Sequence, residues 1–152
     1  LDNISFTVGD MSQLSFSDAY FDSVVCIAAL HHLPTKEERE KALEECWRVL
    51  KPGGIALLSV WAREQALYAT ATPVEGGVEG DVLIPWTREL DKKTFHRYYH
   101  LFSRNEFEEM VGRSSWNGVV FSHAHNHHVF GRKDGAVSLD EVPSELVETT
   151  QN

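Results

Sequence analysis

An almost unbroken apolar run, Val-Val-Cys-Ile-Ala-Ala-Leu, occupies residues 24–30. A short continuous run that is rich in β-branched residues predicts a strand over residues 23–29, buried on both faces as in a parallel sheet. His31 and His32 end the run abruptly, and Pro34 follows them. Because ligands of open α/β sheets bind outside the carboxyl ends of the strands, we expect the chemistry of this chain beside the two histidines.

The next segment has the periodicity of a helix. Thr35 and Glu38 have the spacing of a capping box, and apolar residues then recur at steps of three and four. This pattern predicts a helix over residues 36–50, which the Pro-Gly-Gly sequence at residues 52–54 ends. Residues 55–61 are the next expected buried strand, so the three elements form a right-handed crossover unit.

Weaker patterns complete the expected fold. Alternating apolar and polar residues predict a short strand over residues 4–8, and a second capping-box spacing predicts a helix over residues 103–112. Two closing strands are expected over residues 117–122 and 125–131, as an antiparallel pair. Residues 72–95 are too long and irregular for a simple link, which predicts either a functional lid or a disordered insertion.

Composition and charge narrow the class of protein. With 152 residues, 42% of them apolar and 24% charged, the chain is expected to form one globular domain with a substantial core. Its net charge of −9 argues against generic nucleic-acid binding through the chain as a whole. There is no apolar run of the length that spans a bilayer and no secretory signal, so we expect no membrane association.

The two ends of the chain and its cysteines add further expectations. The first residues have no initiator methionine and read like the middle of a domain, so we expect a fragment. Residues 134–152 are acidic and lack Lys and Arg, which predicts a solvated, disordered tail. Cys26 and Cys46 lie on predicted apolar faces, so we expect reduced core thiols and an intracellular compartment.

The order of several motifs resembles that in the second half of the class I S-adenosylmethionine-dependent methyltransferases. The motifs are Gly-Asp-Met at residues 9–11, the strand that leads to His31, the Lys-Pro-Gly-Gly turn at residues 51–54 and the strand that ends at Trp61. More specific motifs resemble the tRNA wobble-uridine carboxyl methyltransferases, which methylate the carboxylate of 5-carboxymethyluridine. These are Ala-Ala-Leu-His-His at residues 28–32, Asp-Val-Leu-Ile-Pro-Trp at 81–86 and Arg-Tyr-Tyr-His-Leu-Phe at 97–102.

The resemblance covers residues 4–133 and implies a fold. The expected class is α/β, a Rossmann-like class I methyltransferase fold with a mostly parallel sheet and an antiparallel C-terminal hairpin. The glycine-rich cofactor loop of that family should precede Leu1, so we expect the fold to be incomplete at its N-terminus. Residues 1–133 are then the C-terminal part of a methyltransferase domain with an insertion at 72–95, and residues 134–152 are the tail.

The resemblance also implies S-adenosylmethionine as cofactor. Asp10 is expected to accept a hydrogen bond from the adenine amino group, and Met11 is expected to supply a backbone contact or packing. Ile27 and Ala28 would line the channel to the sulfonium. From the residues alone the alternative for Asp10 is a turn-forming residue, and Ile27 and Ala28 are equally plain members of a core strand.

Methyl transfer to a carboxylate needs no strong general base, because the nucleophile is already an anion at neutral pH. Side chains that hydrogen-bond an anion suit the site, so His31 and Arg39 are the predicted catalytic residues. The alternatives are packing for His31 and an exposed helix charge for Arg39. The predicted substrate-binding residues are His32, Trp61, Gln65, Arg97, Tyr98 and His100, with core packing as the alternative for the aromatic ones.

His123, His125 and His127 alternate, so on a strand they would share one face. A metal site usually needs a fourth ligand and no cysteine lies nearby, so no metal residues are predicted. The resemblance implies two partners instead, the anticodon loop of a tRNA and a small zinc-binding activator subunit, and a cytoplasmic or nuclear location. Two other functions stay open: a small-molecule methyltransferase of the same fold, and a non-catalytic remnant.

Overall fold

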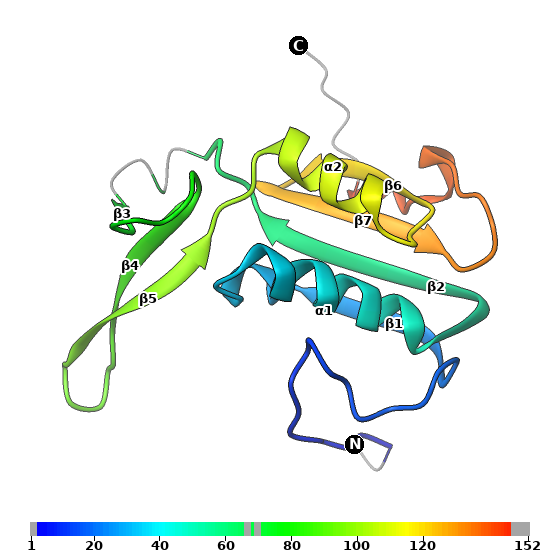
Figure 1. The fold of residues 1–152 in the computed structure, drawn as a ribbon, viewed down its shortest axis with the longest axis horizontal. Helices are drawn as coiled ribbons and strands as arrows, with labels where there is room; N and C mark the ends of the chain where they lie inside the picture. Colours follow the sequence, from blue (N-terminus) through cyan, green and yellow to red (C-terminus); the bar gives the residue numbers. More distant parts are fainter. Residues whose placement is uncertain (1–2, 66–67, 69–70, 147–152) are drawn as a thin grey trace.

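The computed structural model describes residues 3–65, 68 and 71–146, which form two sheets and two α-helices (Figure 1). The main sheet has four strands in the order β1-β2-β7-β6, and a smaller sheet has the order β3-β4-β5. Both α-helices lie on one face of the main sheet, and the smaller sheet projects from it as an arm. The elements are β1 (Phe21–Ile27), η1 (Leu30–His32), α1 (Lys36–Arg48), β2 (Leu50–Trp61), β3 (Thr72–Pro73), β4 (Asp81–Thr87), β5 (Thr94–His100), α2 (Arg104–Arg113), β6 (Gly118–His123), β7 (Asn126–Arg132), η3 (Leu139–Glu141) and η4 (Ser144–Leu146).

The predicted strand–helix–strand unit is confirmed. β1 pairs with β2 in parallel, from Ser23 opposite Ile55 to Ile27 opposite Ser59. β7 runs antiparallel to both β2 and β6. Within the described residues the β1–β2 pair is the parallel one and the other two pairs are antiparallel, so this sheet is mixed rather than mostly parallel.

The prediction that the first strand is buried on both faces is wrong. Val25 is 68% exposed and Ile27 is 53% exposed, whereas Val24 and Cys26 pack against the core. β1 is an edge strand of the described sheet, and α1 and α2 cover only the opposite face (Figure 1). Alternate residues of β1 therefore face the core and the solvent.

The strand expected over residues 4–8 does not form. These residues have no regular structure, and Phe6 and Val8 are 94% and 101% exposed. A strand needs a partner strand for its backbone N–H and C=O groups, and no strand among the described residues lies beside this segment. The loop that follows is held on α1 instead, where Arg48 donates hydrogen bonds to the carbonyl of Phe16 and to Asp18, both at 2.8 Å.

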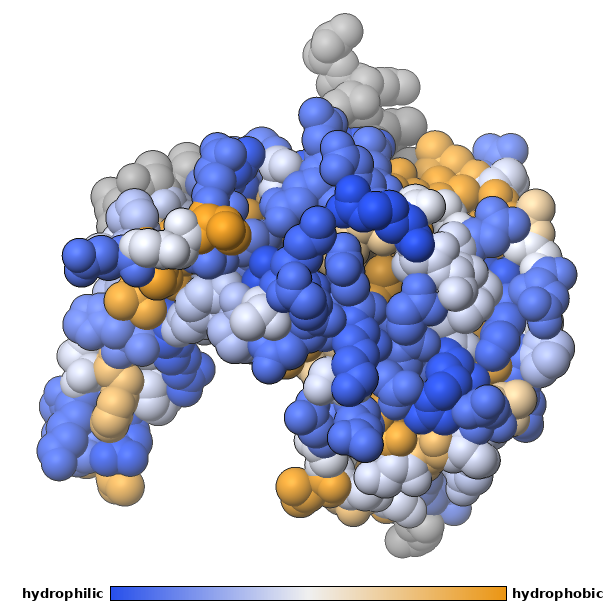
Figure 2. All heavy atoms as spheres, in the orientation of Figure 1, coloured by the Kyte–Doolittle hydropathy of each residue, from blue (hydrophilic) through white to orange (hydrophobic). Residues whose placement is uncertain are grey.

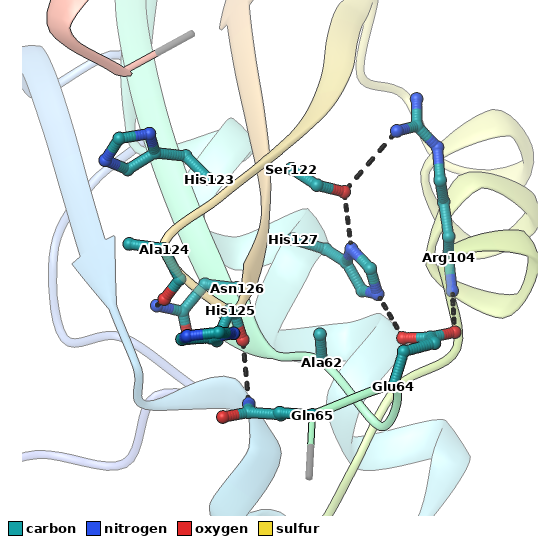
Figure 3. Close-up of a pocket in the computed structure, with 10 residues that line it drawn as sticks. All are labelled: Ala62, Glu64, Gln65, Arg104, Ser122, His123, Ala124, His125, Asn126 and His127. Atoms are coloured by element: carbon teal, nitrogen blue, oxygen red, sulfur yellow. Dashed lines mark hydrogen bonds and ion pairs between the residues drawn. The ribbon is translucent and has the colours of Figure 1, made fainter. Parts of the chain in front are cut away.

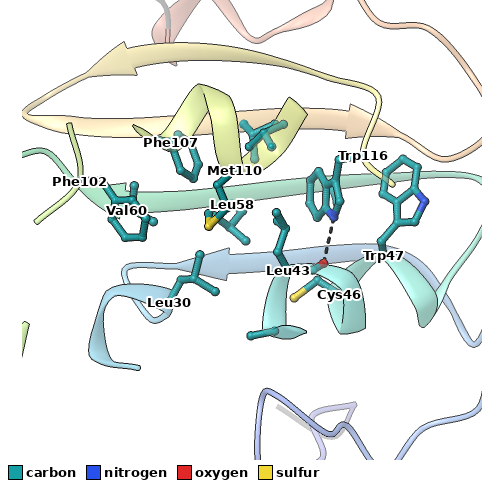
Figure 4. Packing of buried hydrophobic residues seen from close by; sticks show 14 of the residues in the cluster. Leu30, Leu43, Cys46, Trp47, Leu58, Val60, Phe102, Phe107, Met110 and Trp116 are labelled. Atoms are coloured by element: carbon teal, nitrogen blue, oxygen red, sulfur yellow. Dashed lines mark hydrogen bonds between the residues drawn. The ribbon is translucent and has the colours of Figure 1, made fainter. Parts of the chain in front are cut away.

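One core joins the helices to the main sheet (Figure 4). Leu43 of α1, Leu58 of β2 and Phe107 of α2 are each fully buried in it. The indole Nε1 of the buried Trp116 donates to the carbonyl of Leu43 at 2.9 Å, so its polar atom is paired. Burial of these apolar side chains is what fixes the ends of β1 and β2 relative to the helices.

Both helix starts agree with the sequence. The Thr35–Glu38 capping box is present in full, and the hydroxyl of Ser103 accepts from the amide of Glu106 at the start of α2. α1 ends at Arg48, two residues before the predicted end, because Leu50 already belongs to β2. Among the described residues no helix has the length and apolar character that crossing a membrane requires.

The insertion predicted as a lid or a disordered segment contains a β-hairpin. β4 and β5 pair antiparallel over their whole length, from Asp81 opposite His100 to Thr87 opposite Thr94. The short β3 adds a third strand beside β4. We call this β3-β4-β5 sheet, with the turn between β4 and β5, the arm.

The C-terminal hairpin and the tail differ in detail from expectation. β7 begins at Asn126, because Ala124 and His125 form a two-residue turn with φ of 46° and 67°. The described part of the tail is partly ordered: Arg132 pairs with Glu141 at 2.8 Å, and Val142 is only 5% exposed. The expected disorder therefore does not apply to this part, and residues 147–152 lie outside the described chain.

Candidate functional site

The carboxyl end of β1 turns sharply into the two histidines. Ala28 has a positive φ of 52°, and its amide donates to the carbonyl and the hydroxyl of Ser59 in β2 at 3.1 and 3.2 Å. The η1 turn follows, anchored by the fully buried Leu30. These contacts fix the direction in which His31 and His32 leave the strand.

His31 is fully buried and held in its neutral form. Its Nδ1 accepts a hydrogen bond from the backbone amide of Trp61 at 3.2 Å. Burial, followed by the charges of His32 and His100, lowers the pKa of His31 to about 3. The ring proton therefore lies on Nε2, and this buried N–H has no hydrogen-bond partner among the described residues.

Five rings pack together at this point. Trp61 stacks on Tyr99 with ring centroids 4.7 Å apart and on Tyr68 with centroids 5.1 Å apart. His31 lies 4.5 Å from Trp61, and His32 lies 4.7 Å from Tyr99. We call these five residues the ring cluster. It joins the ends of β1 and β2 to the base of the arm.

A chain of polar groups lies beside the ring cluster. Nδ1 and Nε2 of the fully buried His100 contact Asp81 at 2.6 Å and Glu106 at 2.7 Å. The hydroxyl of Tyr98 donates to Asp81 at 2.6 Å and accepts from Arg39 at 3.2 Å. We call these five residues the polar network. It ties β4 and β5 to α1 and α2, so it fixes the base of the arm.

The acid–base state of the network follows from these contacts. Burial acts to raise the pKa of Asp81, but hydrogen bonds from Tyr98 and His100 outweigh it and hold that pKa below its ordinary value. Burial, together with the hydrogen bond to Asp81, raises the pKa of Tyr98 to about 12. At neutral pH Asp81 is thus a carboxylate and Tyr98 is a neutral phenol.

A polar cavity of about 330 Å³ opens at the carboxyl end of β2 (Figure 3). Nε2 of His127 contacts the Glu64 carboxylate at 3.1 Å, and its Nδ1 contacts the Ser122 hydroxyl at 2.9 Å. The other Glu64 oxygen accepts from the amide of Arg104, the first residue of α2, at 3.3 Å. The lining residues are Ala62, Glu64, Gln65, Arg104, Ser122, His123, Ala124, His125, Asn126 and His127.

A second cavity of about 590 Å³ lies between the end of β2 and the arm. Tyr68 of the ring cluster and Asp81 of the polar network line it, and Glu64 and Gln65 line both cavities. The segment after β2 therefore lies between two cavities, and the second cavity reaches the ring cluster at Tyr68.

The structure brings together several of the residues predicted to bind substrate. His31, His32 and Trp61 meet in the ring cluster. Tyr98 and His100, with the predicted catalytic Arg39, belong to the polar network. Gln65 donates to the carbonyl of His125 at 2.7 Å and lines both cavities. The roles of these residues remain predictions.

Other predicted residues lie apart from that group. Arg97 is far along β5, over the ring of Trp86. Asp10 is exposed, and the hydroxyl and amide of Ser12 donate to it at 2.8 Å, so its pKa is lowered. Met11 packs against the core and lines a cavity of about 500 Å³ that contains no member of the ring cluster. Ile27 and Ala28 end β1 next to the η1 turn.

One alternative for Arg39 is excluded. Arg39 is not an exposed helix charge, because only 2% of its surface is accessible. Its Nη1 donates to the carbonyl of Leu33 at 2.9 Å, and its guanidinium lies over the ring of Phe102. Arg39 thus supports the loop that carries the two histidines.

The three alternating histidines do not share a face. His125 lies in the turn, and Ser122 is the residue opposite His127 in the ladder. His123 instead points to the other face, where its ring approaches that of His128. Among the described residues no group of metal-ligating side chains converges.

Sequence reasoning missed Tyr99, Asp81 and Ser122. Tyr99 follows Arg97 at a two-residue step, which would have marked it as part of the same strand face if β5 had been recognised. Asp81 and Ser122 carried no local signal, because each gains its role from partners elsewhere in the chain.

Comparison with known proteins identifies the fold. A family model described as a methyltransferase domain matches residues 1–58. A protein of Encephalitozoon cuniculi assigned as a methyltransferase is 40% identical over 108 residues, which are 71% of this chain and 50% of that protein. The tRNA (carboxymethyluridine(34)-5-O)-methyltransferase of Schizosaccharomyces pombe is 31% identical over 70% of this chain and 53% of its own length. The Arabidopsis thaliana protein of the same name is 48% identical over 38% of this chain and 14% of its own length.

The chain thus spans about half the length of the first and second of these relatives and a smaller share of the third. Among solved structures, a SAM-dependent methyltransferase of Methanosarcina mazei has a TM-score of 0.66 at 24% identity, covering 84% of this chain and 66% of its own. A Burkholderia thailandensis N1-methyltransferase with bound S-adenosylhomocysteine has a TM-score of 0.52 at 18% identity, covering 82% and 48%. The chain therefore carries part of a class I S-adenosylmethionine-dependent methyltransferase fold, and its sequence is similar to those of the tRNA (carboxymethyluridine(34)-5-O)-methyltransferases.

Proposed function

We propose that this chain provides the substrate side of an S-adenosylmethionine-dependent methyltransferase whose substrate is the carboxylate of 5-carboxymethyluridine at the wobble position of tRNA. The names of the similar proteins support this substrate. The structural observation that carries the proposal is His31, which lies at the carboxyl end of β1 beside stacked aromatic rings. It is a buried, neutral imidazole, and its Nε2–H has no hydrogen-bond partner in the described part of the chain.

The ring cluster has the chemistry that this substrate needs. A neutral imidazole donates a hydrogen bond to a carboxylate without giving up its proton, so the nucleophile stays an anion. Tyr68 is an outer ring of the stack that it forms with Trp61 and Tyr99, and it lines the second cavity, where an unstacked base would pack on it as in RNA recognition. The buried setting removes water from the carboxylate, which strengthens these contacts.

The residues that would hold the cofactor are Asp10, Met11, Ile27 and Ala28. The Asp10 carboxylate is exposed, and among the described residues Ser12 donates only to its Oδ1, which leaves Oδ2 to accept from an amino group. Ala28 has a positive φ of 52° where the chain leaves β1. The bound cofactor would supply the electrophilic methyl group, which the carboxylate oxygen takes while the carbon–sulfur bond breaks, with no proton transferred.

We also propose a small zinc-binding activator subunit as a partner. What supports a partner is the apolar surface along β1 and the preceding segment, where Val25, Ile27 and Phe6 are exposed. Size-exclusion chromatography of the chain with such a subunit tests the proposal, since a stable complex is expected and separate elution would reject it.

Analysis of tRNA nucleosides tests the function. The purified chain, S-adenosylmethionine and a tRNA that carries 5-carboxymethyluridine are expected to yield the methyl ester nucleoside, detected by mass spectrometry. A tRNA with plain uridine at the same position is the control and should gain no methyl group. In cells, disruption of the gene should leave the carboxymethyl nucleoside unesterified, and an unchanged methyl ester would overturn the proposal.

A further inference from the structure

We propose that one face of the arm binds single-stranded RNA next to the nucleotide that reacts. This face consists of Arg88, Trp86, Phe95 and Arg97, and we call it the arm face. The inference rests on the proposed function and adds a location for the RNA strand. It requires that flat, exposed rings and guanidinium groups lie on one side of the hairpin, at least one of them without a carboxylate partner.

The strand register and one ring contact place the four residues on the same side. Trp86 is directly opposite Phe95, and Ile84 is opposite Arg97. Since successive residues of a strand alternate between faces, Trp86 of β4 faces the same way as Phe95 and Arg97 of β5. Arg88 follows the end of β4 and reaches this side through its contact with Phe95. The guanidinium of Arg97 lies 3.9 Å from the ring centre of Trp86, and that of Arg88 lies 5.2 Å from the ring centre of Phe95.

The arm face is open to solvent. Trp86 is 39% exposed and Phe95 is 42% exposed. Figure 2 shows the arm standing clear of the main body, with a broad concave gap between the arm tip and the N-terminal part of the chain. About two fifths of the surface of each ring residue is thus exposed, which is enough for a ligand to stack on it.

The charge of the arm differs from that of the rest of the chain. Residues 81–100 contain four Lys and Arg against three Asp and Glu, in a chain whose net charge is −9. Within the described residues Arg97 has no carboxylate partner, whereas Arg88 pairs with Asp91. Arg97 is therefore available for a phosphate, in a segment that lacks the negative charge of the rest of the chain.

The arm face leads directly to the proposed active centre. Tyr99 follows Phe95 and Arg97 at two-residue steps, so it lies on the same side of β5. Tyr99 is also a member of the ring cluster, where it stacks on Trp61 next to His31. A strand that lies along the arm face thus ends at the residues proposed to hold the wobble nucleotide.

The opposite face of the arm has no exposed Trp or Phe among the described residues, and its aromatic side chains are His96, Tyr98 and His100. Thr87 and Thr94 pair through their hydroxyls at 2.9 Å. Tyr98 and His100 point to that face and are bound in the polar network. Exposed rings with cations above them are the combination used by single-strand binding proteins, in which bases stack and the backbone is neutralised.

Binding of a fluorescein-labelled anticodon stem-loop RNA, measured by fluorescence anisotropy without cofactor, tests the inference. W86A is expected to weaken binding roughly 5- to 150-fold, as loss of one base stack does. R97Q should weaken binding several-fold and make it less dependent on salt. The matched controls are T87A on the opposite face and K93Q, which removes the same charge from the turn; both should bind within about twofold of wild type.

A second readout distinguishes the loss of base stacking from misfolding of a variant. Trp86 is the most exposed of the described tryptophans, so RNA stacking should quench tryptophan fluorescence of the wild-type chain, and W86F should lose most of that quenching. Equal losses in R97Q and K93Q would mean general charge attraction and would overturn the inference. So would wild-type affinity in W86A, or RNA binding that does not respond to salt, which would mean that Arg97 makes no phosphate contact.

The outcome is separable from that of the methyl-transfer assay. If the chain forms the methyl ester but W86A and R97Q bind RNA normally, the proposed function stands and the arm face is rejected. If RNA binding depends on the arm face but no methyl ester forms, the arm face stands and the proposed reaction is rejected.

Discussion

The backbone amide of Trp61 donates a hydrogen bond to Nδ1 of His31 at 3.2 Å, so the end of β2 fixes the proton position of a side chain that follows β1. With Nδ1 occupied as an acceptor, the neutral ring carries its proton on Nε2. A strand-to-strand contact therefore prepares a hydrogen-bond donor at the site where we propose that the substrate carboxylate binds.

Two substitutions of His31 should separate its structural contact from its proposed catalytic one. H31N keeps an acceptor for the Trp61 amide but removes the distal donor, whereas H31A removes both and leaves the buried amide unpaired. H31A should lower the free energy of unfolding by about 1–3 kcal/mol more than H31N, measured by urea denaturation. Methyl ester formation should be lost in both.

The control for this pair is H32N, because His32 is exposed and has no hydrogen bond through its ring to the described residues. It should unfold like wild type. Substantial methyl transfer by a folded H31N would show that the distal donor of His31 is not needed, and the proposed role would be wrong.

The buried His31 should also make stability depend on pH. The folded ring has a pKa of about 3 against 6.5 for an ordinary histidine. Below pH 6.5 the unfolded chain gains a proton that the folded chain does not, so the free energy of unfolding falls as pH falls from 6.5 towards 3, by up to about 1.4 kcal/mol per pH unit. Above about pH 7.5 the effect vanishes.

Denaturation curves of wild type and H31N at several pH values measure this term, because the other histidines contribute equally to both. The stability difference between the two chains should change steadily across the acid range. A constant difference from pH 7 to pH 4 would mean that His31 is not kept neutral by the fold.

Asp81 should matter far more than the nearby Glu79, although both substitutions remove one carboxylate. Asp81 is 8% exposed and accepts from Tyr98, His100 and the amide of Val78. Glu79 is 84% exposed in its side chain and has only a surface ion pair with Arg63. D81N should cost about 1–3 kcal/mol in thermal or urea unfolding, and E79Q less than about 1 kcal/mol.

The pH dependence gives a second check on Asp81. Its folded pKa lies below the ordinary value, so its stabilising contribution is present above pH 4 and is lost as the pH falls through the folded pKa. D81N should not show this acid loss. Equal effects of D81N and E79Q would show that the polar network does not hold the arm.

The main sheet was predictable from the sequence because its signals are local. The apolar run that forms β1, the capping box at Thr35 and the glycines after α1 each specify structure through neighbouring residues. The exposure of Val25 was not predictable, since it depends on which strands and helices lie beside β1 rather than on its own composition.

The candidate site was predictable only at the strand end. His31 and His32 follow β1 and Trp61 ends β2, and that position at the carboxyl ends of the strands alone indicated a ligand site. The grouping of Tyr98 with Asp81 and of Trp61 with Tyr99 depends on how the arm docks against the body. The arm was missed because three glycines precede β4, and Pro85 and the charged residues mask the strand alternation of β4 and β5.

The junction between the arm and the body can be tested with two glycines of opposite character. Gly80 has φ of 101°, and a Cβ there would lie 2.5 Å from the carbonyl oxygen of Leu101, whose amide donates to the Gly80 carbonyl at 2.8 Å. Alanine at this position should therefore both strain the backbone and push β5 away, at a cost of about 1–3 kcal/mol. Gly112 lies in α2 with open space around it, so alanine there should stabilise the chain by about 0.5–1 kcal/mol through helix propensity.

Urea unfolding of G80A and G112A measures both changes in the free energy of unfolding, and the expected signs are opposite. A stable G80A with an intact ring cluster, seen as unchanged near-ultraviolet circular dichroism, would show that the arm does not need this close approach to position Tyr99.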